Sequence, residues 1–239
     1  MPDRASEPST EVVLFDVFGT LVDYERDVAM LRYPSTHTLL SEWGMPADHG
    51  EFVGLWSAAS AALEARALAD HREYGMHDVA VEFAGRSAVS LSEQQAAQLV
   101  ASFMAEWKLG IRSIAGVPGM IRRLARRYRL GVVSNTHDPA MVPELLDGLG
   151  VLDEFDVVML SIDHGHRKPH PSIYAAAIDA FGCPPSRMAF VGDTVDADFE
   201  GPTRAGMAAW LVDPLGVARV DAARRLAHIL DLEDRLDRT

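Results

Sequence analysis

Five short runs of apolar residues set the strongest constraint on how this chain of 239 residues folds. The runs are Glu11–Asp16, Leu130–Ser134, Asp156–Ser161, Met188–Asp193 and Ala208–Val212. Continuous apolar runs of this length suit strands that are buried on both faces of a parallel sheet. Helical patterns lie between them, at Gly119–Tyr128, Pro139–Leu149, Ser172–Phe181 and Ala197–Ala205. Strands that alternate with helices predict an α/β fold with a doubly wound, mostly parallel sheet.

The stretch from Arg26 to Ile111 does not follow this alternation. It is rich in Ala, Leu, Glu and Arg, and its periodic segments Glu51–Ala69 and Ser92–Lys108 are helical in pattern. We interpret the stretch as an all-helical domain inserted after the first strand. The expected organisation is a disordered leader at residues 1–10, a Rossmann-like core at 11–25 and 112–239, and a helical cap at 26–111.

Charge and composition exclude several classes of function. The formal net charge is −13, whereas a surface that follows a nucleic-acid backbone needs a basic stripe. Cys183 is the only cysteine, so the chain has no intrachain disulfide and no cysteine-based metal site. No run of about 18 apolar residues occurs, and the N-terminus lacks the apolar segment of a signal peptide. We expect a cytoplasmic protein, a monomer or homodimer, that binds neither nucleic acid nor membranes.

Polar, reactive residues follow four of the predicted strands. Asp16 ends the first, Ser134 and Asn135 end the second, the third leads to Lys168, and the fourth ends at Asp193. Ligands of open α/β sheets bind beyond the carboxyl ends of the strands, so these side chains are expected to converge. Each alone is weak evidence, because polar residues commonly follow strands, but their joint occurrence in this order is specific.

The order of these residues resembles the haloacid dehalogenase superfamily of hydrolases. The matching segments are Phe15–Leu21, Val132–Thr136, Arg167–Pro169 and Val191–Asp198, with Gly201 and Ala205–Met207 continuing the last motif. The resemblance covers about Glu11 to Tyr24 and Ile111 to Pro214. It is specific for the superfamily and much less so for any one member. The insertion after the first motif is similar to that family's helical cap.

The resemblance implies a role for each matching residue. Asp16 is the carboxylate nucleophile, which forms a covalent intermediate that water opens. Lys168 holds the nucleophile and the developing negative charge. Ser134 and Asn135, with the backbone amides of Phe18 and Gly19, bind the anionic group of a small substrate; Thr20 orients Asp16 or a substrate oxygen.

A magnesium site is also implied. Asp16, the Phe18 carbonyl and Asp193 share a Mg²⁺ ion, a hard cation suited to oxygen ligands. Asp198 then orients the metal's waters or Lys168. A structural alternative competes at Asp196, which suits a helix-start cap.

Phe18 departs from the pattern of most phosphatases in the superfamily. These carry a second Asp at that position, which protonates the leaving group and later activates water. Phenylalanine does neither. Related dehalogenases have an aromatic residue there, because a halide leaves without a proton.

Three reactions remain open on these residues. The leading hypothesis is a Mg²⁺-dependent hydrolase of a small phosphorylated metabolite. The alternative is a metal-independent 2-haloacid dehalogenase, although its substrate-binding Arg has no match between Tyr33 and Arg66, leaving Arg26 or Arg32 as substitutes. Phosphonate cleavage would need a lid Lys, and Lys108 lies at the far end of the insertion. A catalytically silent binding protein is the last alternative.

Other chemistry-bearing residues are better explained by structure than by function. The histidines His164, His166 and His170 suit a solvated loop better than a metal site, since no third ligand class lies nearby. The large apolar residues of the insertion suit its core better than a substrate box; they are Trp43, Trp56, Trp107 and Met104.

Overall fold

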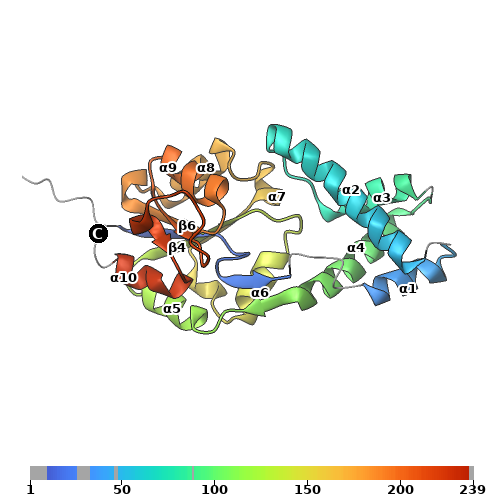
Figure 1. Cartoon of the computed structure of the whole chain (residues 1–239), viewed down its shortest axis with the longest axis horizontal. Helices are drawn as coiled ribbons and strands as arrows, with labels where there is room; N and C mark the ends of the chain where they lie inside the picture. Colours follow the sequence, from blue (N-terminus) through green and yellow to red (C-terminus); the bar gives the residue numbers. More distant parts are fainter. Residues whose placement is uncertain (1–9, 26–32, 46–47, 88, 237–239) are drawn as a thin grey trace, which may run out of the picture. The chain divides into compact units, whose positions relative to one another are not determined.

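The computed structural model describes residues 10–25, 33–45, 48–87 and 89–236. The chain divides into two compact units, one made of Met1–Asp23 with Ser113–Thr239 and the other of Tyr24–Arg112. The first contains the parallel sheet and the second is helical (Figure 1). The leader expected at residues 1–10 lies outside the described residues apart from Thr10.

Six parallel strands form the sheet of the first unit, in the order β5-β4-β1-β6-β7-β8. They are β1 (Val12–Phe15), β4 (Arg129–Ser134), β5 (Val157–Leu160), β6 (Met188–Gly192), β7 (Ala208–Val212) and β8 (Arg225–Leu226). The chain adds β4 and β5 on one side of β1, then crosses to add the others on the opposite side. The sheet therefore reverses its winding at β1, and such a reversal is where open α/β sheets bind ligands. This confirms the predicted α/β class and doubly wound sheet.

Helices cover both faces of this sheet. They are α5 (Val117–Leu124), α6 (Met141–Gly148), α7 (Ser161–His164), α8 (Pro171–Phe181), α9 (Gly201–Arg204) and α10 (Leu232–Leu236). Figure 1 shows α8 and α9 on one side of the sheet and α5 and α10 on the other. The residues of β1 are fully buried, which is why its sequence is apolar without alternation. Val12 and Leu14 pack with Ile173 and Phe181 of α8 in one core cluster.

The second unit contains the helices α1 (Pro34–Glu42), α2 (His49–Asp70), α3 (Met76–Arg86) and α4 (Glu93–Trp107). Its interior is aromatic: Phe52 and Phe83 meet edge to face, and Trp56 lies against Phe83 and Phe103. Trp56 and Met104 are buried, as expected of core residues. The side chain of Glu106 accepts hydrogen bonds from the backbone amides of Ser35 and Thr36 at 2.8 and 2.9 Å, which ties α4 to the start of α1.

Three features of the fold differ from the sequence-based expectation. The helix expected at Ala197–Ala205 begins instead as a π-helix, η5 (Val195–Glu200), and continues as α9. Two short strands, β2 (Val22–Tyr24) and β3 (Ile111–Ser113), pair with each other and carried no clear sequence signal. The edge strand β8 was also not expected, because two residues are too short to form a recognisable pattern.

None of the described helices combines the length and the apolar character that a membrane-spanning segment requires.

Candidate active site

Asp16 directly follows β1, at the point where the winding of the sheet reverses. Its amide donates to the Val191 carbonyl at 2.9 Å, so the residue continues the ladder between β1 and β6. Ser134 ends β4 on one side of it, and Asp193 follows β6 on the other. The parallel register places these strand ends at the same edge of the sheet. Three sequence motifs therefore meet at one place.

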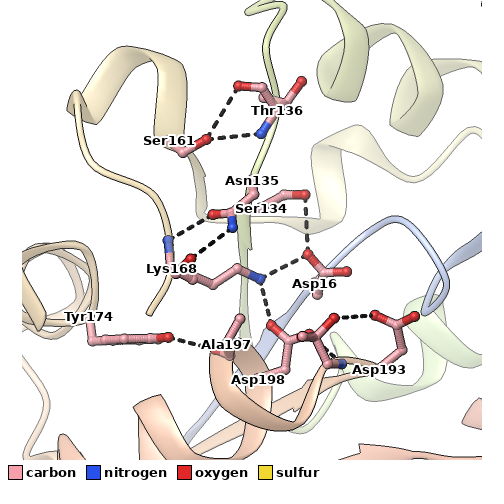
Figure 2. A network of polar contacts seen from close by, with 11 residues as sticks. Asp16, Ser134, Asn135, Thr136, Ser161, Lys168, Tyr174, Asp193, Ala197 and Asp198 are labelled. Atoms are coloured by element: carbon pink, nitrogen blue, oxygen red, sulfur yellow. Dashed lines mark hydrogen bonds and ion pairs between the residues drawn. The ribbon is translucent and has the colours of Figure 1, made fainter. Parts of the chain in front are cut away.

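Lys168 lies between two carboxylates (Figure 2). Its Nζ atom donates to Asp16 Oδ1 at 2.8 Å and to Asp198 Oδ1 at 2.7 Å. The lysine is buried, as are both acids. Burial alone would lower the pKa of Lys168, but the two carboxylates outweigh it and raise that pKa above its ordinary value. Lys168 is therefore a fixed positive charge at the side of Asp16.

Burial and the positive charge of Lys168 shift the pKa of Asp16 in opposite directions. Burial raises the pKa of its carboxyl to about 7, Asp198 and Asp193 act in the same direction, and Lys168 opposes them. Ser134 Oγ donates to Asp16 Oδ1 at 3.2 Å, so both side-chain hydrogen bonds of Asp16 go to that oxygen. The other oxygen, Oδ2, accepts no hydrogen bond from the described residues.

Asp16, Asp193 and Asp198 form the candidate metal centre. Each offers an oxygen, and these oxygens all lie within 4.8 Å of one another. Asp193 is only partly buried, while Asp198 is enclosed and also accepts from the Thr194 amide at 2.9 Å. Carboxylate oxygens alone form a hard donor set that suits Mg²⁺ better than a softer ion. Three acids around one lysine leave excess negative charge, so the residues fit a divalent cation.

The side chain of Asn135 contacts the backbone of the loop that carries Lys168. Its side-chain Nδ2 donates to the Lys168 carbonyl at 3.0 Å, and its Oδ1 accepts from the Lys168 amide at 2.8 Å. Both ends of the carboxamide are thus used to hold the backbone of Lys168. The Asn135 side chain therefore orients the loop that carries the lysine, and its role in substrate binding stays a prediction.

The turn after β1 also corrects one expected contact. The amide of Gly19 donates to the Val22 carbonyl at 2.7 Å, and its φ of +83° closes a tight turn. That amide therefore does not point to a ligand. Phe18 is partly exposed in the same turn, and Thr20 is fully buried. Within the described part of the chain the Thr20 hydroxyl has no hydrogen-bond partner, so it does not orient Asp16 in this structure.

Two supporting hydrogen bonds were not identified from the sequence. Ser161 Oγ accepts from the Thr136 amide at 2.9 Å, which joins the end of β5 to the loop after β4. The Tyr174 hydroxyl donates to the Ala197 carbonyl at 2.5 Å, beside Asp198 (Figure 2). Pairs such as these are far apart in the chain and have no spacing signature. Only the apolar period of α8, which points Tyr174 into the core, was visible in the sequence.

The remaining candidates lie outside the site. Asp196 pairs with Arg204 at 3.2 Å on the surface and is not the cap that we expected, because η5 begins after Thr194. His164 Nε2 and His170 Nδ1 each lie 2.8 Å from Ser172 Oγ, and the only potential metal cluster among the described residues is that of the three aspartates.

Comparisons with known proteins agree with this geometry. The family model of the haloacid dehalogenase-like hydrolases matches residues 10–206. A phosphoglycolate phosphatase of Nitrosococcus oceani is 27% identical over 187 residues, which are 77% of this chain and 76% of that protein. A glyceraldehyde 3-phosphate phosphatase of Methanothermobacter thermautotrophicus is 38% identical over 89 residues, but these span only 37% of this chain and 39% of that protein.

Solved structures show the same fold. A 2-haloacid dehalogenase from Pseudomonas syringae pv. Tomato DC3000 superimposes with a TM-score of 0.72 at 22% identity, over 96% of this chain and 99% of that one. The family match covers most of the chain, including β1, the lysine loop and the acidic residues after β6. The chain belongs to the haloacid dehalogenase-like hydrolases.

Proposed function

We propose that this hydrolase is a Mg²⁺-dependent phosphohydrolase that acts on a small phosphorylated metabolite. The observation that carries the proposal is the grouping of Asp16, Asp193 and Asp198, whose oxygens lie within 4.8 Å of one another beside a single lysine. Displacement of a halide requires a nucleophile and an anion-binding group. It does not require Asp193, whose repulsion on Asp16 would then destabilise the site without serving the reaction, whereas Asp198 holds Lys168 in either case.

The proposed reaction proceeds in two steps through an aspartyl phosphate on Asp16. Lys168 and Ser134 hold Oδ1 of Asp16, which leaves Oδ2 as the oxygen that attacks phosphorus. The bond to the leaving group breaks, and the leaving group departs with the electron pair. Water then attacks the phosphorus of the aspartyl phosphate, which releases phosphate and restores Asp16.

The metal would be held by Asp16, Asp193 and the Phe18 carbonyl, with Asp198 beside them. A bound Mg²⁺ ion would neutralise charge on the phosphoryl oxygens during transfer. Asp198 keeps Lys168 in place, since the ammonium lies between the two carboxylates.

Phe18 determines which leaving groups this site can handle. Its ring occupies the turn where a second Asp would donate a proton, and it has no proton to give. Leaving groups that are stable as anions, such as phenolates, carboxylates or phosphates, depart without that help. We therefore propose that the substrates are activated esters or anhydrides, and that simple alkyl phosphates react slowly.

The relatives support hydrolysis of phosphate esters in general, but their named substrates are alkyl phosphates, so the preference for activated leaving groups rests on Phe18 alone. The matched proteins named above are a phosphoglycolate phosphatase and a glyceraldehyde 3-phosphate phosphatase, both of which act on small phosphorylated compounds by name. The all-helical unit is proposed to act as a cap that excludes water from the site.

A second candidate is 2-haloacid dehalogenase activity, which Phe18 favours. In that reaction Asp16 would displace halide from carbon to form an ester, and water would hydrolyse the ester. Arg26 and Arg32, the residues proposed to bind such a substrate, lie outside the described residues.

Two assays distinguish these candidates. We expect purified protein to hydrolyse an activated aryl phosphate with Mg²⁺ and to lose this activity in a chelator. Asp193→Asn should lower it by more than about 10-fold, because a ligand contributes at least as much as its supporting groups. The matched control is Asp196→Asn, an exposed aspartate of the same segment that pairs with Arg204. Release of halide from a 2-chloro acid that persists in chelator would refute the phosphohydrolase proposal.

Phe18→Asp tests the argument about the leaving group. The variant should raise kcat/KM on an alkyl phosphate by on the order of 10²-fold, because general acid catalysis contributes at least that much. The rate on the activated aryl phosphate should change far less. Phe18→Asn is the control, with the same shape as Asp and no carboxyl proton. Equal rates for the two variants on the alkyl phosphate would contradict the argument.

Asp16→Asn tests how much the buried charge of Asp16 lowers the free energy of unfolding. Burial raises the pKa of Asp16 from 3.8 to about 7, so the folded protein retains a proton that the unfolded chain releases. Stability should therefore fall as the pH rises between these values, since the native state binds more protons. Asn does not titrate, so the variant should lose less stability than the wild type as the pH rises.

The measurement is thermal unfolding without metal at several pH values. At high pH the variant should melt higher than the wild type, by roughly 2–4 °C for each kcal/mol of repulsion removed. Asp196→Asn should follow the wild type. If the melting temperatures of Asp16→Asn and the wild type depend on pH in the same way, the charge of Asp16 does not destabilise the fold.

A further inference from the structure

The acidic segment after β6 accepts a hydrogen bond from one buried side chain, the hydroxyl of Tyr174. Tyr174, in α8, is 1% exposed and belongs to the core cluster with Leu14 and Phe190. Its ring meets Phe190 edge to face at 6.1 Å, which fixes its direction. The hydroxyl at the end of the ring donates to the Ala197 carbonyl at 2.5 Å. Ala197 immediately precedes Asp198, the partner of Lys168.

The Ala197 carbonyl needs this donor because of the local sequence. In the π-helix η5, a carbonyl accepts from the amide five residues further on. The Gly201 amide donates in this way to the Asp196 carbonyl. The corresponding donor for Ala197 would be residue 202, which is Pro202 and has no N–H. Ala197 is buried, so without another donor its carbonyl would lack a partner.

Two glycines make room for this arrangement. A Cβ atom at Gly201 would overlap the Tyr174 hydroxyl, and one at Gly192 would overlap the Asp198 side chain. The absence of both side chains lets Tyr174 and Asp198 approach the backbone from opposite ends of the segment. Two interactions then join η5 to α8 and the loop before it. One is the hydrogen bond between Tyr174 and Ala197, and the other is the ion pair between Lys168 and Asp198.

We infer that Tyr174 is a positioning residue, which holds Asp198 against Lys168 through the Ala197 carbonyl. The inference deepens the proposed function, on which its kinetic consequence rests. Its structural consequence does not depend on any activity. The Thr194 amide donates to Asp198 Oδ2 at 2.9 Å, so the exchange of that amide hydrogen reports whether Asp198 stays in place.

Tyr174→Phe removes only the hydroxyl. We expect the Thr194 amide of the isotope-labelled full chain to exchange at least about 10-fold faster by NMR, which corresponds to the loss of one buried hydrogen bond. The matched control is Tyr33→Phe, because Tyr33 is also 1% exposed but its hydroxyl has no hydrogen-bond partner among the described residues. In the control, Thr194 should exchange at the wild-type rate.

A compensating variant tests the path through the carbonyl. Pro202→Ala supplies an N–H five residues after Ala197, so Tyr174→Phe with Pro202→Ala should recover most of the protection at Thr194. On an activated aryl phosphate, Tyr174→Phe should lower kcat by about 10-fold with KM changed less than about twofold.

Two results would overturn the inference. One is wild-type exchange at Thr194 in Tyr174→Phe. The other is fast exchange that Pro202→Ala does not reduce, which would place the effect outside the Ala197 carbonyl. If no phosphate ester is turned over by any variant, the proposed function fails while the exchange result still decides the role of Tyr174.

Discussion

The ion pairs of Lys168 are the interaction on which the site depends. One ammonium group bonds to Asp16 and to Asp198, and all three side chains are buried. An unpaired ammonium in such a place is strongly unfavourable, so Lys168 requires at least one carboxylate partner. The pairs join the loop before α8 to the ends of β1 and β6. They also leave one oxygen of Asp16 without a hydrogen bond from the described residues, which is what a nucleophile needs.

The sheet positions these charges because its winding reverses at β1. Asp16 stands between the ends of β4 and β6, and the parallel register fixes which side chains reach it. The cost of the arrangement is visible in Asp16 itself, whose pKa rises to about 7 through burial and the neighbouring acids. A divalent cation would relieve this repulsion. Strain of this kind at a functional site is common, because sites are built for chemistry rather than for stability.

The strands and the residues at their ends could be predicted from the sequence, since both have local causes. An apolar run such as Val12–Phe15 indicates a buried strand, and the acid after it must lie at the sheet's edge. The role of Asn135 could not be predicted, because its partner Lys168 is 33 residues away and uses backbone atoms. The π-helix was missed for a similar reason. Pro202 signals a missing donor, but only the folded chain shows that Tyr174 replaces it.

Asp16 is proposed to form a covalent intermediate, which mass spectrometry after rapid acid quenching would detect. The substrate would be whichever of the aryl phosphate and the 2-chloro acid the protein turns over, with the reaction stopped before steady state. We expect a phosphoryl or ester adduct on the peptide that contains Asp16, and neither adduct nor turnover in Asp16→Asn. Turnover with the adduct on another side chain, or turnover by Asp16→Asn at the wild-type rate, would contradict it.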